Sequence, residues 1–281
     1  MRRFKNVAIV GVGLVGGSVG LALRKREMAE KVIGIGRRQV SLRIARRVGA
    51  VTNTTVDMAK GVAEADLVIV CTPAGRIVED VRHAAKYCRR STLITDAGSV
   101  KRSIVEALDE GLPNQCRFLG SHPLAGSEKS GAANASAELF QGRVAVITPT
   151  KNTLAEDFDL IEEFWQDLGS MVVQMSAEEH DRALAVTSHL PHIAAAALAV
   201  TVPERLFRLT GTGLRDTTRL ASSNPELRLQ ILALNRDHVL TALEQYGAKL
   251  AAFHAALRDN DQAALKGFLT QAKKNRDALG S

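Results

Sequence analysis

The chain has 281 residues, of which 46% are hydrophobic, 24% are charged and only 4% are aromatic, and its formal net charge is +7. Its three cysteines, Cys71, Cys88 and Cys116, are odd in number and lack metal-ligand spacing, which argues against a disulfide scaffold or a structural zinc site. No unbroken apolar run approaches the roughly 20 residues that span a bilayer, and the basic start leads into a strand-and-turn pattern rather than a signal peptide. We therefore expect a cytoplasmic protein without a membrane partner.

The positive charge is concentrated near the start of the chain. Residues 1–50 contain twelve basic and two acidic residues, whereas the remainder contains slightly more acidic than basic residues. Such an excess suits a polyanionic ligand, a nucleic acid or a membrane surface. The length predicts about two domains.

Short apolar runs alternate with helical patterns over residues 1–150. The runs are apolar throughout, as in parallel strands covered on both faces, and the segments between them repeat apolar residues every three or four positions. The pattern predicts a Rossmann-type α/β domain, a doubly wound and mainly parallel sheet. The predicted strands are residues 7–10, 32–35, 67–71, 93–95, 117–119 and 144–147; the predicted helices are residues 14–24, 41–48, 76–87 and 100–108.

Residues 151–281 have a different texture. A helix is predicted over residues 154–168 and a possible further strand over residues 172–175, and nearly everything after residue 177 has a helical pattern. Residues 227–257 repeat leucines at helical spacing, and Asp261 is placed to cap a last helix. We therefore predict an all-helical C-terminal domain.

The first predicted strand ends in a glycine-rich motif, Gly11-Val12-Gly13-Leu14-Val15-Gly16. Gly11 would permit a tight turn, Gly13 the close approach of a pyrophosphate, and Gly16 the close packing of helix on strand, while the helix N-terminus supplies N–H donors. A bare motif of this kind also occurs in simple turns. Because a strand precedes it and a helix follows, we predict a dinucleotide-binding loop that includes Leu14 and Val15.

The second predicted strand ends in Gly36-Arg37-Arg38. An NAD enzyme usually has a carboxylate there for the ribose hydroxyls, and guanidinium groups suit a 2′-phosphate. The alternative is that both arginines are merely solvated. Since a carboxylate is missing where cations stand, we predict that NADP is preferred over NAD.

Polar residues follow three of the other predicted strands. Thr72 and Pro73 follow the strand at residues 67–71, and Ser99 follows the next strand within Asp96-Ala97-Gly98-Ser99-Val100-Lys101. Ligands of open α/β sheets bind at this carboxyl edge, so Thr72 and Pro73 are candidates for cofactor binding. His122, expected in a loop after a third strand, is a candidate general base, and Ser99 could share its hydrogen bond to a substrate hydroxyl.

The motifs together resemble the prephenate/arogenate dehydrogenases, the cyclohexadienyl dehydrogenases of tyrosine biosynthesis. The resemblance rests on the glycine loop, the Asp96–Lys101 motif, the segment Gly120-Ser121-His122-Pro123-Leu124-Ala125-Gly126, and Ser188-His189-Leu190-Pro191-His192. The last two segments are far more specific than the glycine loop. The resemblance covers the whole chain.

The resemblance implies an oxidative decarboxylation. A ring carbon of prephenate or arogenate gives a hydride to NAD(P), the ring hydroxyl loses its proton and carbon dioxide leaves. His122 matches the family's catalytic histidine and Ser99 the serine between hydroxyl and nicotinamide. The residues that match substrate-binding positions are Ser188, His189, His192, Glu128 and Arg219, the last pairing with a carboxylate of the dicarboxylate substrate. The helical domain implies a homodimer.

One departure from the family pattern and two alternative functions remain. Near Pro225 the family often carries an aromatic residue, where this chain has Glu226-Leu227-Arg228. His192 favours prephenate, whereas the NADP-like Gly36-Arg37-Arg38 favours arogenate, so the choice between the two substrates stays open. An NADP-dependent β-hydroxyacid or 6-phosphogluconate-type dehydrogenase shares the two-domain plan but relies on a catalytic lysine motif that we do not find. A nucleotide-sensing or nucleic-acid-binding module would use the basic N-terminal face, yet the chain lacks a recognisable nucleic-acid motif, so no nucleic-acid partner is expected.

Overall fold

The computed structural model describes residues 4–126 and 129–280. Its contacts divide the chain into two compact units, Met1–Asn235 and Arg236–Ser281. The first unit contains the whole sheet and the helices up to residue 234, so every element discussed below as part of the candidate site belongs to one unit.

The first unit is built on an eight-stranded sheet with the order β3-β2-β1-β4-β5-β6-β7-β8. Neighbouring strands are parallel except β6 and β7. The chain runs outward from β1 to β3 and then returns to place β4 on the other side of β1, so the order reverses between β1 and β4, the place where such sheets bind ligands. The strands are β1 (Phe4–Val10), β2 (Ala29–Ile35), β3 (Asn53–Thr55), β4 (Leu67–Val70), β5 (Leu93–Asp96), β6 (Arg117–Pro123), β7 (Val144–Thr148) and β8 (Met171–Gln174).

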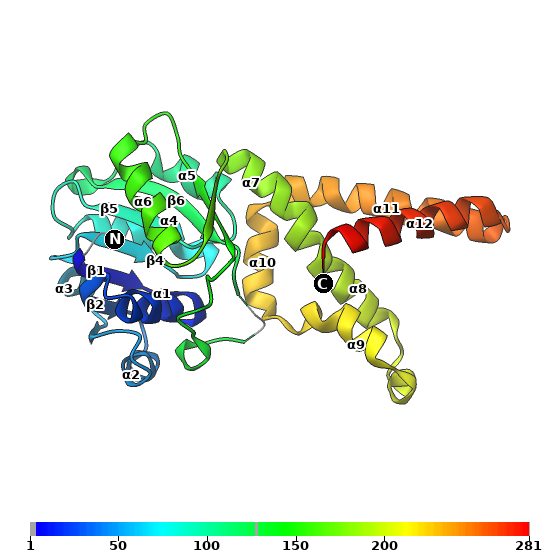
Figure 1. Cartoon of the computed structure of the whole chain (residues 1–281), viewed down its shortest axis with the longest axis horizontal. Helices are drawn as coiled ribbons and strands as arrows, with labels where there is room; N and C mark the ends of the chain where they lie inside the picture. The colour runs from blue at the N-terminus through cyan, green and yellow to red at the C-terminus, as the bar shows by residue number, and fades with distance from the viewer. Residues whose placement is uncertain (1–3, 127–128, 281) are drawn as a thin grey trace. The chain divides into compact units, whose positions relative to one another are not determined.

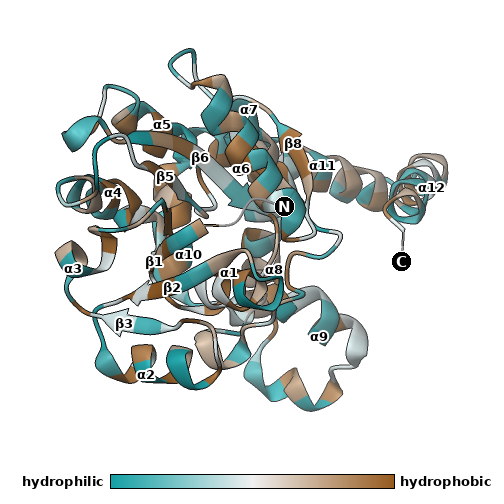
Figure 2. Cartoon of the chain, turned by 60° about the vertical axis from the view of Figure 1, so that its left-hand side comes forward, coloured by the Kyte–Doolittle hydropathy of each residue, from teal (hydrophilic) through white to brown (hydrophobic). Residues whose placement is uncertain are grey.

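Helices cover both faces of this sheet, which confirms the predicted doubly wound α/β class (Figure 1). Successive strand residues point to opposite faces: in β1, Val7 and Ile9 join one buried cluster while Ala8 and Val10 join the other. The central strands are accordingly mostly apolar (Figure 2). One face is covered by α1 (Leu14–Lys25), α2 (Gln39–Arg47) and α6 (Ala155–Asp167), and the other by α3 (Met58–Val62), α4 (Ile77–Ala85) and α5 (Arg102–Leu108).

The sheet differs from its sequence-based outline at several points. β1 and β2 each begin three residues before the predicted strands. The short edge strand β3 was not predicted, because Asn53-Thr54-Thr55 is polar and only its pairing with β2 reveals it. β6 continues to Pro123, four residues beyond the predicted strand. The further strand expected at residues 172–175 is confirmed as β8, Met171–Gln174. Because β8 pairs with β7 and α6 packs on the sheet, the sheet extends past residue 150. The predicted domain boundary between residues 150 and 151 stays a prediction.

Helices follow β8. One continuous helical segment, Ala177–Thr201, comprises α7 (Ala177–Leu184), a π-helical turn (Ala185–His189) and α8 (Leu190–Thr201). By length and composition alone this segment is apolar enough to cross a bilayer, with 22% of its apolar window buried. It contains the Ser188–His192 motif, which therefore lies in the middle of a helical segment. Then come two 3-10 turns and two helices, Glu204–Leu209, α9 (Thr212–Thr218), Arg219–Ser222 and α10 (Pro225–Leu234).

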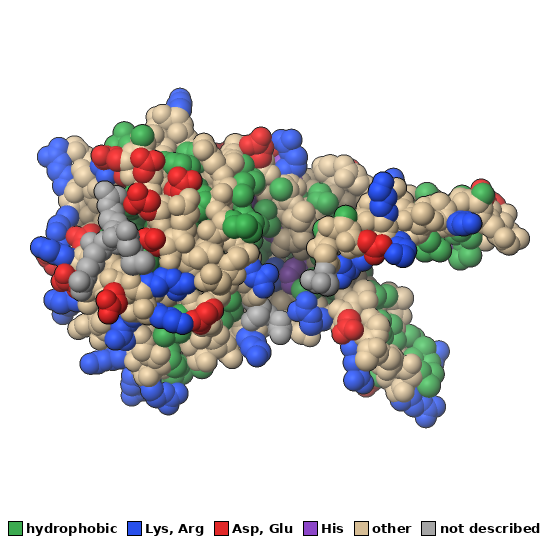
Figure 3. All heavy atoms as spheres, viewed as in Figure 1, with side chains coloured by type: hydrophobic (Ala, Val, Ile, Leu, Met, Phe, Trp, Pro, Cys, Tyr) green, Lys and Arg blue, Asp and Glu red, His purple; other side chains and the backbone are tan. Residues whose placement is uncertain are grey.

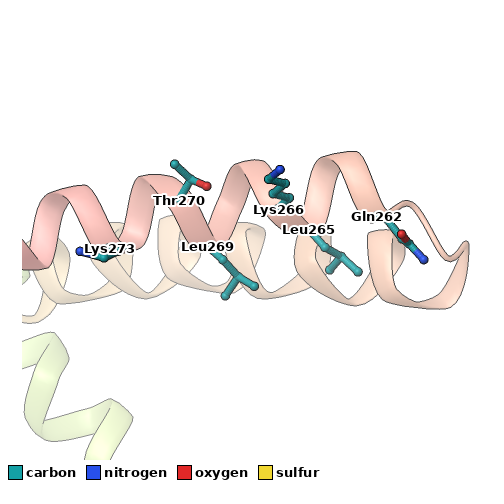
Figure 4. A pocket seen from close by; sticks show the side chains of 6 residues that line it. All are labelled: Gln262, Leu265, Lys266, Leu269, Thr270 and Lys273. Atoms are coloured by element: carbon teal, nitrogen blue, oxygen red, sulfur yellow. The ribbon is translucent and has the colours of Figure 1, made fainter.

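The second unit is a pair of helices, α11 (Arg236–Arg258) and α12 (Gln262–Ala278). The Asp261 side chain accepts a hydrogen bond from the Ala264 N–H, which confirms the predicted cap. Phe253 and Phe268 join the two helices with ring centroids 5.1 Å apart. Leu265 and Leu269 project from one side of α12, where they line a shallow surface pocket (Figure 4).

Candidate active site

The glycine loop lies at the reversal point of the sheet, between the end of β1 and the start of α1. Gly11 has φ +92°, and a Cβ there would lie 2.8 Å from the Cys71 carbonyl oxygen at the end of neighbouring β4. A Cβ on Gly16 would lie 2.2 Å from the carbonyl oxygen of Gly11. By contrast, nothing lies within 4 Å of the corresponding point on Gly13. Gly11 and Gly16 are therefore needed for close packing, whereas Gly13 leaves open space beside the backbone.

These residues fit a dinucleotide. α1 begins at Leu14 without a side-chain cap, so the N–H groups of its first turn are available for phosphate oxygens. On the adjacent strand end, Thr72 Oγ1 is buried and has no hydrogen-bond partner among the described residues. A buried hydroxyl without a partner is costly, and a cofactor beside it would supply one. The residues predicted to bind the cofactor thus lie together at the carboxyl edge of β1 and β4: Gly11, Gly13, Leu14, Val15, Gly16, Thr72 and Pro73.

Arg37 and Arg38 follow Gly36 at the end of β2. Both side chains are exposed, and neither forms an ion pair with a described residue. The next helix, α2, adds exposed Arg43, Arg46 and Arg47, and Figure 3 shows basic side chains gathered over this part of the molecule. Five of the twelve basic residues in the first fifty therefore lie together at the end of β2 and on α2.

A buried ion pair organises the ends of β5 and β6. Asp96, the last residue of β5, pairs with Lys101 Nζ, and both side chains are fully buried. The other carboxylate oxygen of Asp96 accepts a hydrogen bond from the Ser121 N–H at 3.1 Å, and its backbone carbonyl accepts one from Ser121 Oγ at 2.6 Å. Asp96 thereby continues the hydrogen bonding of β6 after β5 has ended.

His122 lies within β6 and not in a loop, which corrects the sequence-based expectation. It is paired with Val146 in the antiparallel β6–β7 ladder, and the residue is 9% exposed. The predicted strand stopped at Leu119 because Gly120-Ser121-His122-Pro123 lacks strand-forming residues. The pairing with β7, more than twenty residues away, extends it. A strand position fixes the imidazole more firmly than a loop.

His122 heads a chain of three buried side chains. Its Nδ1 lies 2.9 Å from His180 Nε2, and His180 Nδ1 lies 2.7 Å from Asp181 Oδ1. Burial opposes the charge of Asp181, yet hydrogen bonds from His180 and from the Lys101 and Arg102 N–H groups lower its pKa. Asp181 is therefore an ionised acceptor at neutral pH.

The acceptor role of Asp181 fixes the tautomers of both histidines. Burial lowers the pKa of His180, and burial together with the positive charge of Lys101 brings the pKa of His122 well below its usual range, so both rings are neutral near pH 7. His180 must donate its Nδ1–H to Asp181, so its Nε2 accepts the Nδ1–H of His122. The lone pair of His122 is then on Nε2, which hydrogen-bonds to no described residue.

His189 is held at the π-helical turn. Its Nδ1 lies 3.1 Å from Asn235 Nδ2, which also donates to the Asp181 carbonyl oxygen at 2.7 Å. Burial lowers the pKa of His189 to about 4, so the ring is neutral and, because Nδ1 accepts, carries its proton on Nε2. That Nε2 is buried without a partner among the described residues. The site thus offers an unpaired donor as well as an unpaired acceptor.

Pro191 explains the widened turn. Proline has no N–H to donate to the carbonyl four residues earlier, and its ring crowds that carbonyl. A π-helical turn directly before it relieves the crowding, and such turns are frequent at functional sites. The Ser188–His192 motif, Ser-His-Leu-Pro-His, therefore encodes both the side chains and the backbone that presents them.

His192 lies among cations on the next turn. Its Nδ1 donates to the Leu220 carbonyl oxygen at 3.1 Å, beside Ser223 Oγ. Burial and the positive charges of Arg228 and Arg219 lower the pKa of His192, which places both guanidinium groups near this ring. Arg219 is exposed on the turn Arg219–Ser222.

The remaining predicted residues have different outcomes. Ser99 and Ser188 are partly exposed and form no side-chain hydrogen bond with a described residue, and the hydrogen-bond partner of His122 is His180. Glu128 lies outside the described residues. The sequence reasoning missed His180, Asp181 and Asn235. The adjacent pair His180-Asp181 on a predicted helix was the available signal, but nothing local ties it to His122.

Comparison with known proteins identifies the family. Residues 19–174 match the model of the prephenate dehydrogenase nucleotide-binding domain, and residues 176–271 match that of the prephenate dehydrogenase dimerization domain. The chain belongs to the prephenate dehydrogenase family. It is therefore a nicotinamide-dependent dehydrogenase, and the resemblance stated from the sequence motifs is confirmed.

Individual relatives agree over nearly the full length. The chain is 34% identical to a cyclohexadienyl dehydrogenase of Zymomonas mobilis over 99% of this chain and 97% of the relative. It is 33% identical to a prephenate dehydrogenase of Bacillus subtilis over 97% of this chain and 76% of the relative. Among solved structures, prephenate dehydrogenase from A. aeolicus, in complex with hydroxyphenyl propionate and NAD+, superposes with a TM-score of 0.92 at 32% identity, covering 98% of each chain.

Proposed function

We propose that this enzyme oxidatively decarboxylates prephenate or arogenate, a step of tyrosine biosynthesis, with NADP as the preferred hydride acceptor. The observation that carries the proposal is the neutral, buried His122, with its free Nε2 held by His180 and Asp181 at the same sheet edge as the glycine loop. Membership of the prephenate dehydrogenase family supports the choice of substrate class.

The cofactor would be held by the chain's own backbone and by two arginines. The first turn of α1 and the open space beside Gly13 suit the pyrophosphate, and Thr72 Oγ1 suits a ribose or amide group. Arg37 and Arg38 are exposed at the end of β2, where no carboxylate stands to favour NAD, and this supports their contact with a 2′-phosphate. When bound, the nicotinamide accepts a hydride.

His122 would act as the general base. Its Nε2 takes the proton of the ring hydroxyl as the hydride leaves the same carbon, so that carbon gains carbonyl character. This carbonyl accepts the electron pair released when the ring carboxylate departs as carbon dioxide, and the ring becomes aromatic. The imidazolium that forms on His122 donates to His180, which is held in turn by the carboxylate of Asp181. Asp181 thus stabilises a charge that burial alone would disfavour.

Residues from the helical segments would orient the substrate. Arg219 provides a cation for a carboxylate, because an unpaired charge in a closed site is costly. His189 offers its unpaired Nε2–H to an oxygen of the ligand, and Ser99, Ser188 and His192 are further candidate contacts. The expected contribution of Glu128 is retained from the family resemblance alone.

The partner that we propose is a second copy of this chain. Residues 176–271 match a dimerization-domain model, and several large apolar side chains of this region are exposed in the single chain, among them Val200 (85%), Leu209 (74%) and Leu229 (65%). Burial of such residues between two copies is favourable by about 25 cal/mol per Å². We also propose that the enzyme is cytoplasmic.

A four-way assay tests the proposed function. Prephenate and arogenate are each supplied with NAD and with NADP, and kcat/KM is measured for each pair. We expect turnover of at least one ring substrate, with NADP favoured, and in the double variant Arg37→Gln/Arg38→Gln a rise in KM for NADP with little change for NAD. Absence of turnover in all four combinations would refute the activity, and a strong preference for NAD in the wild type would refute the cofactor assignment alone.

A further inference from the structure

Arg228 lies half-buried on α10, within the same unit as the candidate active site. Its Nε donates to Ser223 Oγ at 3.2 Å, and Ser223 Oγ lies 3.3 Å from His192 Nδ1. No carboxylate of a described residue pairs with it, and burial is the influence that lowers its pKa. A guanidinium that is partly removed from water without a counter-ion is unfavourable, so an anion is the ligand that this position lacks.

α10 also reaches the sheet edge that carries the cofactor loop. Gln230 Oε1 accepts a hydrogen bond from the Gly75 N–H at 3.3 Å, three residues after Thr72. Ile231 packs into the buried cluster formed with α4 and β4. Arg228, two residues before Gln230, is therefore carried by a helix anchored at the carboxyl edge of β4.

The surroundings of Arg228 link it to the reacting histidine. Through Ser223 Oγ it is joined to His192, and its positive charge lowers the pKa of His192 and of His189. His189 has an unpaired, buried Nε2, and through Asn235 it is joined to Asp181, which holds His180 against His122. An anionic group bound between Arg228 and His189 would thus belong to the molecule on which His122 acts.

We propose that Arg228 is a specificity-determining residue that favours prephenate over arogenate, an inference that rests on the proposed function. Both substrates carry two carboxylates, for which Arg219 and Arg228 provide two cations. They differ at the side chain, where prephenate has a keto group and arogenate an ammonium group. A guanidinium beside His189 and His192 repels an ammonium group and attracts a keto acid. His189 Nε2–H likewise suits a keto oxygen and cannot accept from an ammonium group.

The test compares kcat/KM for both substrates in wild type, Arg228→Gln and Arg228→Lys. In Arg228→Gln we expect kcat/KM for prephenate to fall on the order of ten- to a hundredfold, mainly through KM, as loss of a charge-assisted hydrogen bond predicts. The value for arogenate should change less than about threefold or rise, because repulsion is removed with attraction. Arg228→Lys keeps the charge and should retain part of the preference. Arg205→Gln, on the exposed turn Glu204–Leu209, is the matched control and should leave the ratio unchanged.

Product binding provides a readout that does not depend on turnover. By calorimetry, Arg228→Gln should weaken binding of 4-hydroxyphenylpyruvate more than binding of tyrosine. If the wild type acts on prephenate and Arg228→Gln lowers both substrates equally, or if both products lose affinity equally, the assignment of Arg228 is wrong while the proposed function stands. If the wild type turns over neither substrate, the proposed function fails and this inference fails with it.

Discussion

At the scale of single residues, the chemistry depends on protonation states that the protein interior imposes. Three histidines that would each be about half protonated near pH 6.5 in water are neutral here because burial disfavours their charged forms. Hydrogen bonds then decide which ring nitrogen carries the proton. Asp181 makes His180 an acceptor toward His122, and Asn235 makes His189 a donor toward the site. The same residue type thus supplies both the proposed base and the proposed donor.

Replacement of His122 should abolish most of the activity. His122→Asn keeps a polar side chain of similar reach but has no basic nitrogen, so we expect kcat to fall on the order of a hundredfold or more with KM for the substrate nearly unchanged. The matched control is His83→Asn, an exposed histidine on α4, which should retain full activity. Steady-state kinetics give both values, and near-normal turnover in His122→Asn would show that another group is the base.

Asp181 should act through the histidines rather than on the substrate. In Asp181→Asn the side chain no longer carries the negative charge that stabilises imidazolium formation, so we expect kcat to fall about tenfold to a hundredfold. The acidic limb of the kcat/KM profile, which should lie well below pH 6.5 in the wild type because burial lowers the pKa of His122, should shift as well. If Asp181→Asn instead raises KM for the substrate and leaves the pH profile unshifted, the role of Asp181 is purely structural.

At the scale of elements, the sequence predicts strands and helices that have a local pattern of apolar residues. It misses strands that form only through pairing with residues distant in the chain. The buried strands and the helices around them were evident from apolar runs and helical spacing, and so was the glycine loop. β3 and the end of β6 were missed because polar residues form strands there only through neighbours distant in sequence. For the same reason His122 and Ser99 could be selected from strand ends, whereas His180 and Asp181, on a helix almost sixty residues later, could not.

The π-helical turn allows a prediction about this element. Pro191→Ala restores an N–H that can bond to the carbonyl of residue 187 and thereby favours a regular helix through the motif. The turn would then rotate Ser188 and His189 relative to Asn235, so kcat/KM should fall at least about tenfold while the melting temperature stays equal or rises. Activity and thermal unfolding are measured on the same sample. Unchanged activity together with higher stability would mean that the widened turn has no part in presenting these side chains.

At the scale of the whole molecule, the buried neutral histidines connect activity to acid stability. Their folded-state pKa values lie below the unfolded value near 6.5, so the unfolded chain binds more protons as the pH falls. The stability present above pH 6.5 is therefore lost progressively below it, and for His189 the loss is complete near its folded pKa of about 4. Its size is about 3 kcal/mol for this residue.

Urea unfolding between pH 7.5 and 4.5 measures this dependence. We expect the free energy of unfolding to fall over this range in the wild type and to fall less in His189→Gln. His254→Gln, at an exposed position on α11, is the control and should follow the wild type. Parallel curves for all three proteins would show that His189 does not titrate differently in the folded and unfolded chains.

The switch of β6 from parallel to antiparallel pairing has a consequence for how this enzyme can diversify. His122 lies where β7 pairs with one edge of β6, and on the other edge Asp96 accepts a hydrogen bond from the neighbouring Ser121 N–H. The proposed base is therefore part of the same sheet that carries the glycine loop. The residues proposed to read the substrate, Arg219 and Arg228 among them, lie on separate helical segments. Substitutions on α10 and its neighbouring segments can therefore change the substrate preference without moving the proposed proton acceptor. Substrate recognition and proton transfer can thus evolve at different rates.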